Sequence, residues 1–122
     1  MEIWQNRSPY LEVEQIGRTA LVRFCSSQLI ESEAVEGIGR KLSTLVEKSG
    51  AVDLLLNAAP VEQVSSALIG LLVRLQTQVQ VRGGQVAFCN VQPRLFEQLE
   101  RLRLHTFFPI YRDEEEARQA LG

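Results

Sequence analysis

The chain has 122 residues, of which 45% are hydrophobic and 23% charged, and its net charge at pH 7 is -2. This length suits one domain with one core, and the net charge gives no overall positive field that would attract nucleic acid. There is no secretory signal pattern, and the longest apolar stretch, residues 67–73, is far shorter than the ~20 residues of a membrane span. We therefore expect a cytoplasmic protein whose partners include neither nucleic acid nor membrane.

Two segments near the start alternate in polarity, as half-buried β-strands do. They cover residues 11–16 and 19–24. Because only Gly17 and Arg18 separate them, the pattern predicts a β-hairpin in which glycine supplies a positive φ.

Helical and strand-like patterns alternate after the hairpin. Ser32 and Glu33 are typical of a helix start, and apolar residues at helical spacing continue to Val46. The apolar run at residues 52–56 predicts a strand that is covered on both faces. A polar loop is expected at residues 57–64.

The second helix has the strongest pattern and is expected to begin at Ser66. The glycine pair Gly83-Gly84 ends it and leads into a strand at residues 85–91. The predicted inner face of this second helix carries leucines and a valine at helical spacing: Leu68, Leu71, Leu72, Leu75 and Val79.

The last third of the chain predicts two helices around a short strand. Pro93 suits the first position of a helix, whose inward residues we predict to be Leu95, Phe96, Leu99 and Leu102. Residues 108–111 read as a short edge strand. Asp113 and Glu116 resemble a capping box that opens a final helix near Glu114.

The element order is β-β-α-β-α-β-α-β-α, which predicts an α/β fold. We expect a mixed, mostly parallel sheet of about five strands, with the first strand antiparallel at one side and helices on the faces. The domain is expected to cover residues 11–122, after an N-terminal extension at residues 1–10. The predicted core includes six large side chains: Leu54, Leu56, Leu71, Leu75, Phe88 and Phe96.

Side chains that could support catalysis or bind a metal are few. Cys25 and Cys89 each lie in or at the end of a predicted buried strand, which indicates free structural thiols rather than a disulfide. His105 is the single histidine and has no acid or cysteine at ligand spacing. Nothing in the sequence pairs Cys25 with His105 as nucleophile and base. We expect no enzyme activity, no metal and no cofactor.

Two sequence segments resemble the STAS domain family, which includes the antagonists of bacterial anti-sigma factors. They run from Arg82 to Pro93 and from Leu104 to Leu121, and the resemblance as a whole extends from Leu11 to Leu121. It implies a single STAS-like domain that works as a protein-binding signalling adaptor in transcription regulation. The implied partner is an anti-sigma factor or a related serine kinase.

The family's functional motif is Asp-Ser-Ser-Gly at the start of the second main helix. Here that position holds Val64-Ser65-Ser66-Ala67. The resemblance implies phosphorylation of Ser66, with Ser65 the less favoured acceptor. A helix start tolerates the added charge, and one of the two serines is also expected to cap the helix. The motif's Asp and Gly are absent, and Glu62 is the nearest upstream carboxylate.

The loop after the second strand also differs from its counterparts in the family, which have a glycine and an acidic turn there. In the family this loop borders the serine motif and helps to form the partner surface. Leu29 and Ile30 either anchor the partner or cover the end of the core. The resemblance implies a partner surface of seven residues: Ser26, Ser27, Gln28, Glu62, Val64, Ser65 and Ala67.

Two alternatives to the phospho-regulated adaptor stay open. One is a constitutive STAS scaffold without a working phospho-switch, which the altered motif would suit. The other is a small nucleotide- or lipid-binding STAS module that uses the loops at the helix N-termini.

Overall fold

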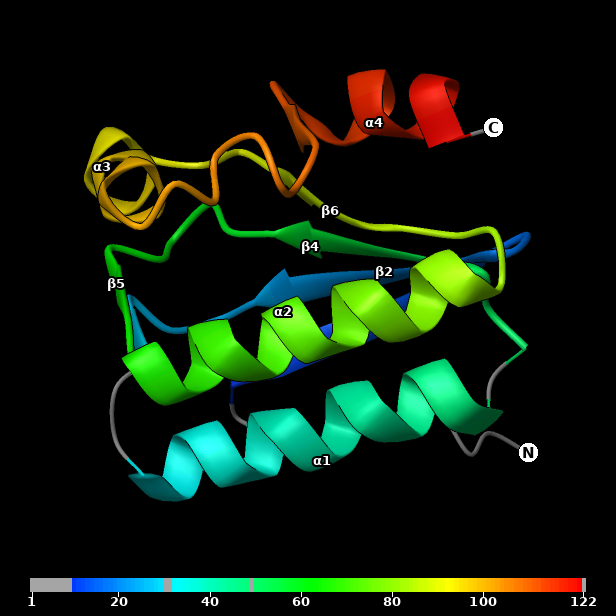
Figure 1. Ribbon diagram of the computed structural model, residues 1–122, viewed down its shortest axis with the longest axis horizontal. Helices are drawn as coiled ribbons and strands as arrows, with labels where there is room; N and C mark the ends of the chain where they lie inside the picture. The colour runs from blue at the N-terminus through cyan, green and yellow to red at the C-terminus, as the bar shows by residue number, and fades with distance from the viewer. Residues whose placement is uncertain (1–9, 30–31, 49, 122) are drawn as a thin grey trace.

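The computed structural model describes residues 10–29, 32–48 and 50–121. Residues 1–9 of the predicted extension therefore lie outside the described residues, and Ile30 does too. Tyr10 is described. Within the described ranges the chain forms a sheet with helices on both faces (Figure 1).

A five-stranded sheet forms the centre of the fold, in the order β1-β2-β4-β6-β7. β1 runs antiparallel to β2, and the other neighbouring pairs are parallel. This confirms the predicted α/β class with an antiparallel strand at one side. The strands are β1 (Leu11–Ile16), β2 (Thr19–Phe24), β4 (Asp53–Asn57), β6 (Val86–Cys89) and β7 (Ile110–Tyr111).

Two further strands were not predicted. β3 (Gln28–Leu29) and β5 (Gln63–Val64) pair in parallel and form a separate two-stranded sheet. β5 lies in the segment that the sequence predicts as a loop. Two residues are too few to show the alternation of polarity that identifies a strand, and the pairing partner is distant in sequence.

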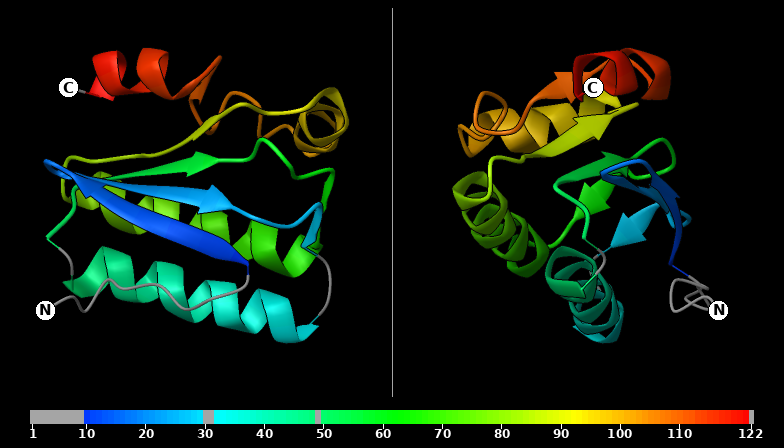
Figure 2. Two further views of the ribbon diagram at one scale, coloured as in Figure 1. Left: turned by 180° about the vertical axis from the view of Figure 1, so that it is seen from behind. Right: turned by 90° about the vertical axis from the view of Figure 1, so that its right-hand side faces the viewer.

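The helices begin where the sequence predicts them. α1 (Ser32–Lys48) and α2 (Ser66–Val81) lie on one face of the sheet, and α4 (Glu114–Leu121) lies on the other (Figure 2). α3 (Pro93–Arg101) packs near β5, beyond the ends of the central strands (Figure 1). The positive φ of 58° at Gly17 agrees with the predicted hairpin turn.

Burial confirms most of the predicted core. Leu54, Leu56, Leu75 and Phe88 are buried between the sheet and the helices. A smaller cluster on the opposite face of the sheet is closed by α4: Leu21, Leu55, Ala87, Cys89 and Ala117.

Three apolar residues are less buried than predicted. Leu71 is partly buried. Its side chain points toward α1, and a Cβ added at Gly39 of α1 would lie 3.0 Å from its Cδ2 atom. Phe96 is also partly buried, and its ring makes an edge-to-face contact with that of His105 at 5.8 Å between centroids. Leu102 is 49% exposed because it lies at the end of α3.

A buried glutamine on α2 joins that helix to the sheet. Gln76 Nε2 donates to the Val86 carbonyl (2.9 Å) and to the Phe107 carbonyl (3.2 Å), and Gln76 Oε1 accepts from Val86 N (2.7 Å). Its amide therefore pairs with the first residue of β6 as a neighbouring strand would. A polar side chain can be fully buried at this position because its donors and acceptor have partners.

An ion pair fastens α4 to the sheet. Arg23 of β2 donates to both carboxylate oxygens of Glu114, through Nε at 2.8 Å and Nη2 at 3.0 Å. Asn57 of β4 donates to the same carboxylate, and Glu14 of β1 accepts from Arg23 Nη1 at 3.0 Å. The hydrogen bond from Arg23, and to a smaller extent that from Asn57, lowers the pKa of Glu114.

The two leucines of α2 that differ in burial give a matched test of the helix phase. Leu75→Ala should lower the free energy of unfolding by about 2–5 kcal/mol because it opens a cavity in the core. Leu71→Ala should cost clearly less, since its side chain already meets solvent. Urea denaturation of both variants measures the difference, and equal losses would contradict the observed orientation of α2.

The ion pair of Glu114 should make stability depend on pH in a defined direction. A lowered pKa means that its contribution is present above the unfolded-state pKa, about 4.3 for Glu, and is lost as pH falls through the folded-state pKa. Glu114→Gln should therefore lower the free energy of unfolding at neutral pH, and the difference from the parent should shrink on acidification. Denaturant titrations across this range measure it, with the exposed neighbour substitution Glu115→Gln as control. A difference independent of pH would argue against the ion pair.

Candidate functional site

Ser65 and Ser66 have different environments at the start of α2. Ser65 is the N-cap, and its Oγ accepts a hydrogen bond from Leu68 N at 3.0 Å. Ser66 is the first residue of the helix, and its side chain is exposed. Ser65 therefore provides the cap, while the Ser66 hydroxyl is accessible from solvent next to the positive end of the helix dipole.

Backbone hydrogen bonds hold the segment before Ser65 against the loop after β2. The Ser27 carbonyl accepts from Glu62 N at 2.7 Å and from Gln63 N at 3.3 Å. The Leu29 carbonyl accepts from Ser65 N at 2.9 Å. These bonds include the β3–β5 pairing, and they bring the loop around Ser27 beside the serine motif, as the resemblance implies.

A second glutamine fixes the other side of β5. Gln98 Nε2 donates to the Val64 carbonyl at 2.7 Å, and Gln98 Oε1 accepts from Val64 N at 3.3 Å. The side chain belongs to α3, so this helix holds the residue two positions before Ser66. Gln98 was not predicted as part of the site, because a glutamine between the buried Leu95 and Leu99 has no sequence pattern that marks its partner.

Two further contacts from the start of α3 reach the same segment. Gln92 Nε2 donates to the Ala59 carbonyl at 2.6 Å. Arg94 and Glu62 form an exposed ion pair at 3.4 Å, which contributes little to stability because both groups are solvated. The start of α2 is thus supported by β3 on one side and by α3 on the other.

Most residues of the predicted partner surface have solvent-accessible side chains. Ser27, Gln28 and Ala67 are exposed, and Ser26, Ser65 and Glu62 are partly buried. The exception is Val64, whose side chain is buried at 8% exposure and packs in the core. In β5 successive side chains point to opposite faces, so Gln63 faces solvent and Val64 does not. The prediction that the Val64 side chain lies in this surface needs correction.

The structure also decides between the two roles that the sequence leaves open for Leu29. It is 1% exposed and belongs to the main core. Of the two roles that the sequence left open for this residue, covering the end of the core is the one observed.

The two cysteines are free thiols in different environments. Cys89 is buried, and burial raises the pKa of its thiol to about 12. The prediction that Cys25 is buried at a strand end is wrong, because β2 ends at Phe24 and Cys25 is exposed beyond it. Partial desolvation and Glu12 raise the pKa of the Cys25 thiol, which disfavours the reactive thiolate.

The described residues bring together no group of three or more metal-ligating side chains. His105 is partly buried against Phe96, with its Nδ1 atom buried and lacking a hydrogen-bond partner. None of the described helices is both long and apolar enough to cross a bilayer. What the start of α2 offers chemically is an accessible hydroxyl on a polar surface.

Comparison with protein families gives one decisive match. The model of the STAS domain matches residues 10–117. The chain belongs to the STAS domain family. Comparison with curated protein sequences found no match.

Solved structures share this STAS fold at low sequence identity. The cell fate determinant SpoIIAA of Bacillus, in its phosphorylated form, is 21% identical with a TM-score of 0.72, covering 92% of this chain and 99% of its own. An anti-sigma-factor antagonist domain protein of Planctomyces limnophilus is 22% identical with a TM-score of 0.79, covering 91% and 97%. The murine Solute Carrier 26 family member A9 anion transporter is 15% identical with a TM-score of 0.69, covering 90% and 18%. The chain thus resembles both anti-sigma factor antagonists and part of a transporter.

Gln98→Glu should loosen the segment before Ser66. The new carboxylate could still accept from Val64 N, but it would place an acceptor against the Val64 carbonyl and leave that carbonyl without its donor. We expect a loss of about 1–3 kcal/mol in the free energy of unfolding and faster hydrogen exchange at the Val64 amide. Glu97→Gln, an exposed change at the neighbouring position, is the control. Unchanged exchange at Val64 would show that Gln98 does not support β5.

Proposed function

We propose that this STAS domain is a signalling adaptor that binds an anti-sigma factor or a related serine kinase and releases it when Ser66 is phosphorylated. The observation that carries the proposal is the exposed Ser66 hydroxyl at the first position of α2, beside a separate capping serine. The structural likeness to SpoIIAA, an anti-sigma factor antagonist whose phosphorylated form has been solved, supports this direction.

The electrostatics of the surface suit a switch by phosphorylation. The exposed side chains of the supporting β3–β5 segment, Ser27, Gln28 and Gln63, are neutral, and the adjacent Glu62 is paired with Arg94. A phosphate would add roughly −1.5 to −2 charges there. The helix dipole stabilises that charge within the chain, while a partner surface that fitted a neutral patch would have to desolvate it. Binding would weaken and the fold would persist.

Partner recognition would also use surface that is already in place. Ser26, Ser27 and Gln28 lie on the loop that pairs with the segment before Ser65. The hydrogen bonds of Gln98 restrain that segment from the opposite side. A restrained surface loses little conformational freedom on association, which favours binding.

A constitutive scaffold is the second candidate, and the burial of Val64 favours it. The family motif has an aspartate at this position, whereas here the side chain is apolar and packs in the core. No carboxylate is therefore presented at this point for a kinase to recognise. Introducing one by Val64→Asp would bury a charge and destabilise the fold, so the motif cannot be restored here by a single substitution.

The adjacent serines provide a matched test. With an anti-sigma-type serine kinase and Mg-ATP, we expect one phosphate per chain, lost in Ser66→Ala and kept in Ser65→Ala. Ser65→Ala should instead lower the free energy of unfolding by about 1 kcal/mol, because the helix loses its cap. Intact-mass measurement and urea denaturation separate the two effects.

Partner capture completes the experiment. Ser66→Asp should weaken binding of the same kinase while leaving the melting temperature close to that of the parent, since an acid is tolerated at a helix start. Ala67→Gly tests whether the methyl group hinders the kinase, and faster phosphorylation would show that it does. Absence of phosphate combined with full capture by Ser66→Asp would favour the constitutive scaffold.

A further inference from the structure

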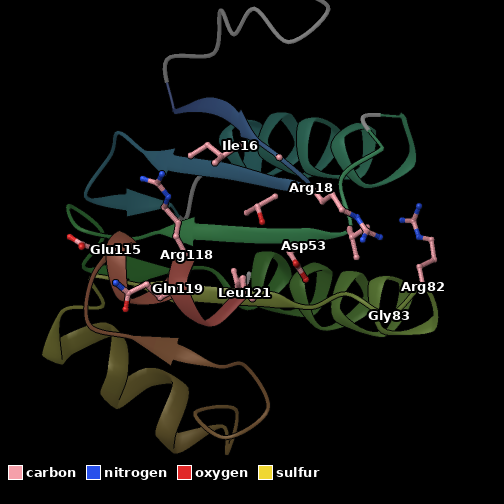
Figure 3. A pocket seen from close by; sticks show the side chains of 12 residues that line it. Ile16, Arg18, Asp53, Arg82, Gly83, Glu115, Arg118, Gln119 and Leu121 are labelled. Carbon is pink, nitrogen blue, oxygen red and sulfur yellow. The ribbon is translucent and has the colours of Figure 1, made fainter.

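A second site is suggested by a cleft at the other end of the sheet. It lies where β2 and β4 begin and has a volume of about 1030 Å³ (Figure 3). The β1–β2 turn, the start of β4, the end of α2 and residues of α4 form its walls. The 16 residues of α2 separate Ser66 from this cleft by about 24 Å, at 1.5 Å per residue. The cleft is therefore distinct from the proposed partner surface.

Three arginines from three different elements line the cleft, although the chain as a whole is slightly acidic. They are Arg18 in the hairpin turn, Arg82 at the end of α2 and Arg118 in α4. All three are exposed. Arg82 Nη2 donates to the Val46 carbonyl of α1 at 2.7 Å, so one of its N–H groups is used within the fold. In Figure 3, Arg18 and Arg82 lie on one side of the cleft and Arg118 on the other.

Two carboxylates also line the cleft, and each is placed so that it only partly offsets the arginines. Asp53 Oδ1 accepts from Gln85 N at 3.0 Å, so one oxygen is engaged in the fold. Burial raises the pKa of Asp53, while the hydrogen bond from Gln85 N and the nearby Arg18 charge act in the opposite direction. Glu115 projects on the side away from Arg18 and Arg82 (Figure 3).

Apolar side chains line another part of the cleft. Ile16, Val52 and Leu121 are half-buried and face the cleft from the hairpin, the β4 approach and α4. An opening with guanidinium groups at one side and apolar surface beside them suits an amphipathic small molecule. Its volume lies at the upper limit of the roughly 300–1,000 Å³ typical of clefts that hold ligands of drug size.

We propose that this cleft binds a small, soluble organic phosphate. The Arg18 and Arg82 guanidinium groups would bind the phosphate, because a guanidinium presents parallel donors to phosphate oxygens. Ile16, Val52 and Leu121 would cover the apolar body of the ligand. Arg118 would close the far side.

Phenyl phosphate is a probe that carries both parts of the proposed ligand. Titrated into the ¹⁵N-labelled chain, it should shift the amide signals of Gly17, Arg18, Asp53 and Gly83 and leave that of Ser66 unchanged. Inorganic phosphate and phenol each supply half of the chemistry and should bind at least tenfold more weakly. This experiment contains no kinase, so its outcome is independent of the proposed function.

Arg18→Gln should weaken phenyl phosphate binding at least tenfold, because Arg18 is exposed and its removal leaves the fold in place. Arg101→Gln, an equal change of charge at an exposed position of α3, should have no effect. If both variants weakened phenyl phosphate binding equally, the effect would come from the overall charge of the chain, and the proposal would be overturned. Absence of shifts at the cleft, or equal binding of phenol, would overturn it as well.

A lipid headgroup presents the same phosphate chemistry on a surface. Sedimentation with vesicles of phosphatidylcholine and phosphatidic acid separates this source from a soluble ligand. We expect the chain to remain in the supernatant. Sedimentation that Arg18→Gln abolishes would overturn the assignment to a soluble ligand.

Discussion

The fold depends on the burial of three consecutive leucines in β4. Leu54, Leu55 and Leu56 are each at most 2% exposed, and in a strand successive side chains point to opposite faces. A strand of this kind must be covered on both sides. α1 and α2 cover one face, and the short α4 covers the other. The ion pair between Arg23 and Glu114 therefore has a structural role, since it fixes α4 against the second face of the sheet.

Glutamine side chains complete the backbone pairing at both ends of the molecule. Gln76 pairs with Val86 at the start of β6, and Gln98 pairs with Val64 in β5. In each case the side-chain amide has the same donor and acceptor as a peptide group, so it satisfies backbone atoms where no strand lies alongside. These two residues fix α2 to the sheet and α3 to the segment before Ser66. The position of the exposed serine follows from them.

Local patterns in the sequence account well for the main elements. The hairpin at Gly17, the helix starts at Ser66 and Pro93, and the parallel centre of the sheet all follow from alternation, capping and glycine or proline chemistry. The exposed position of Ser66 also agrees with the family resemblance.

Details that depend on distant contacts could not be predicted in this way. The β3–β5 pairing and the inward direction of Val64 arise only when the loop after β2 meets the segment before α2. Leu71 has the spacing of a core residue, yet the approach of α1 at Gly39 places it between the two helices. Cys25 lies one residue beyond the end of β2, a boundary that polarity alone does not define.

The separation of the capping serine from the exposed serine has a consequence for the lifetime of the protein in a cell. Because Ser65 secures the helix start, a modification of Ser66 would leave the population of unfolded chains almost unchanged. Proteolytic turnover that follows that population would then be the same in both states. The amount of this protein would stay constant while the proposed switch at Ser66 changed state.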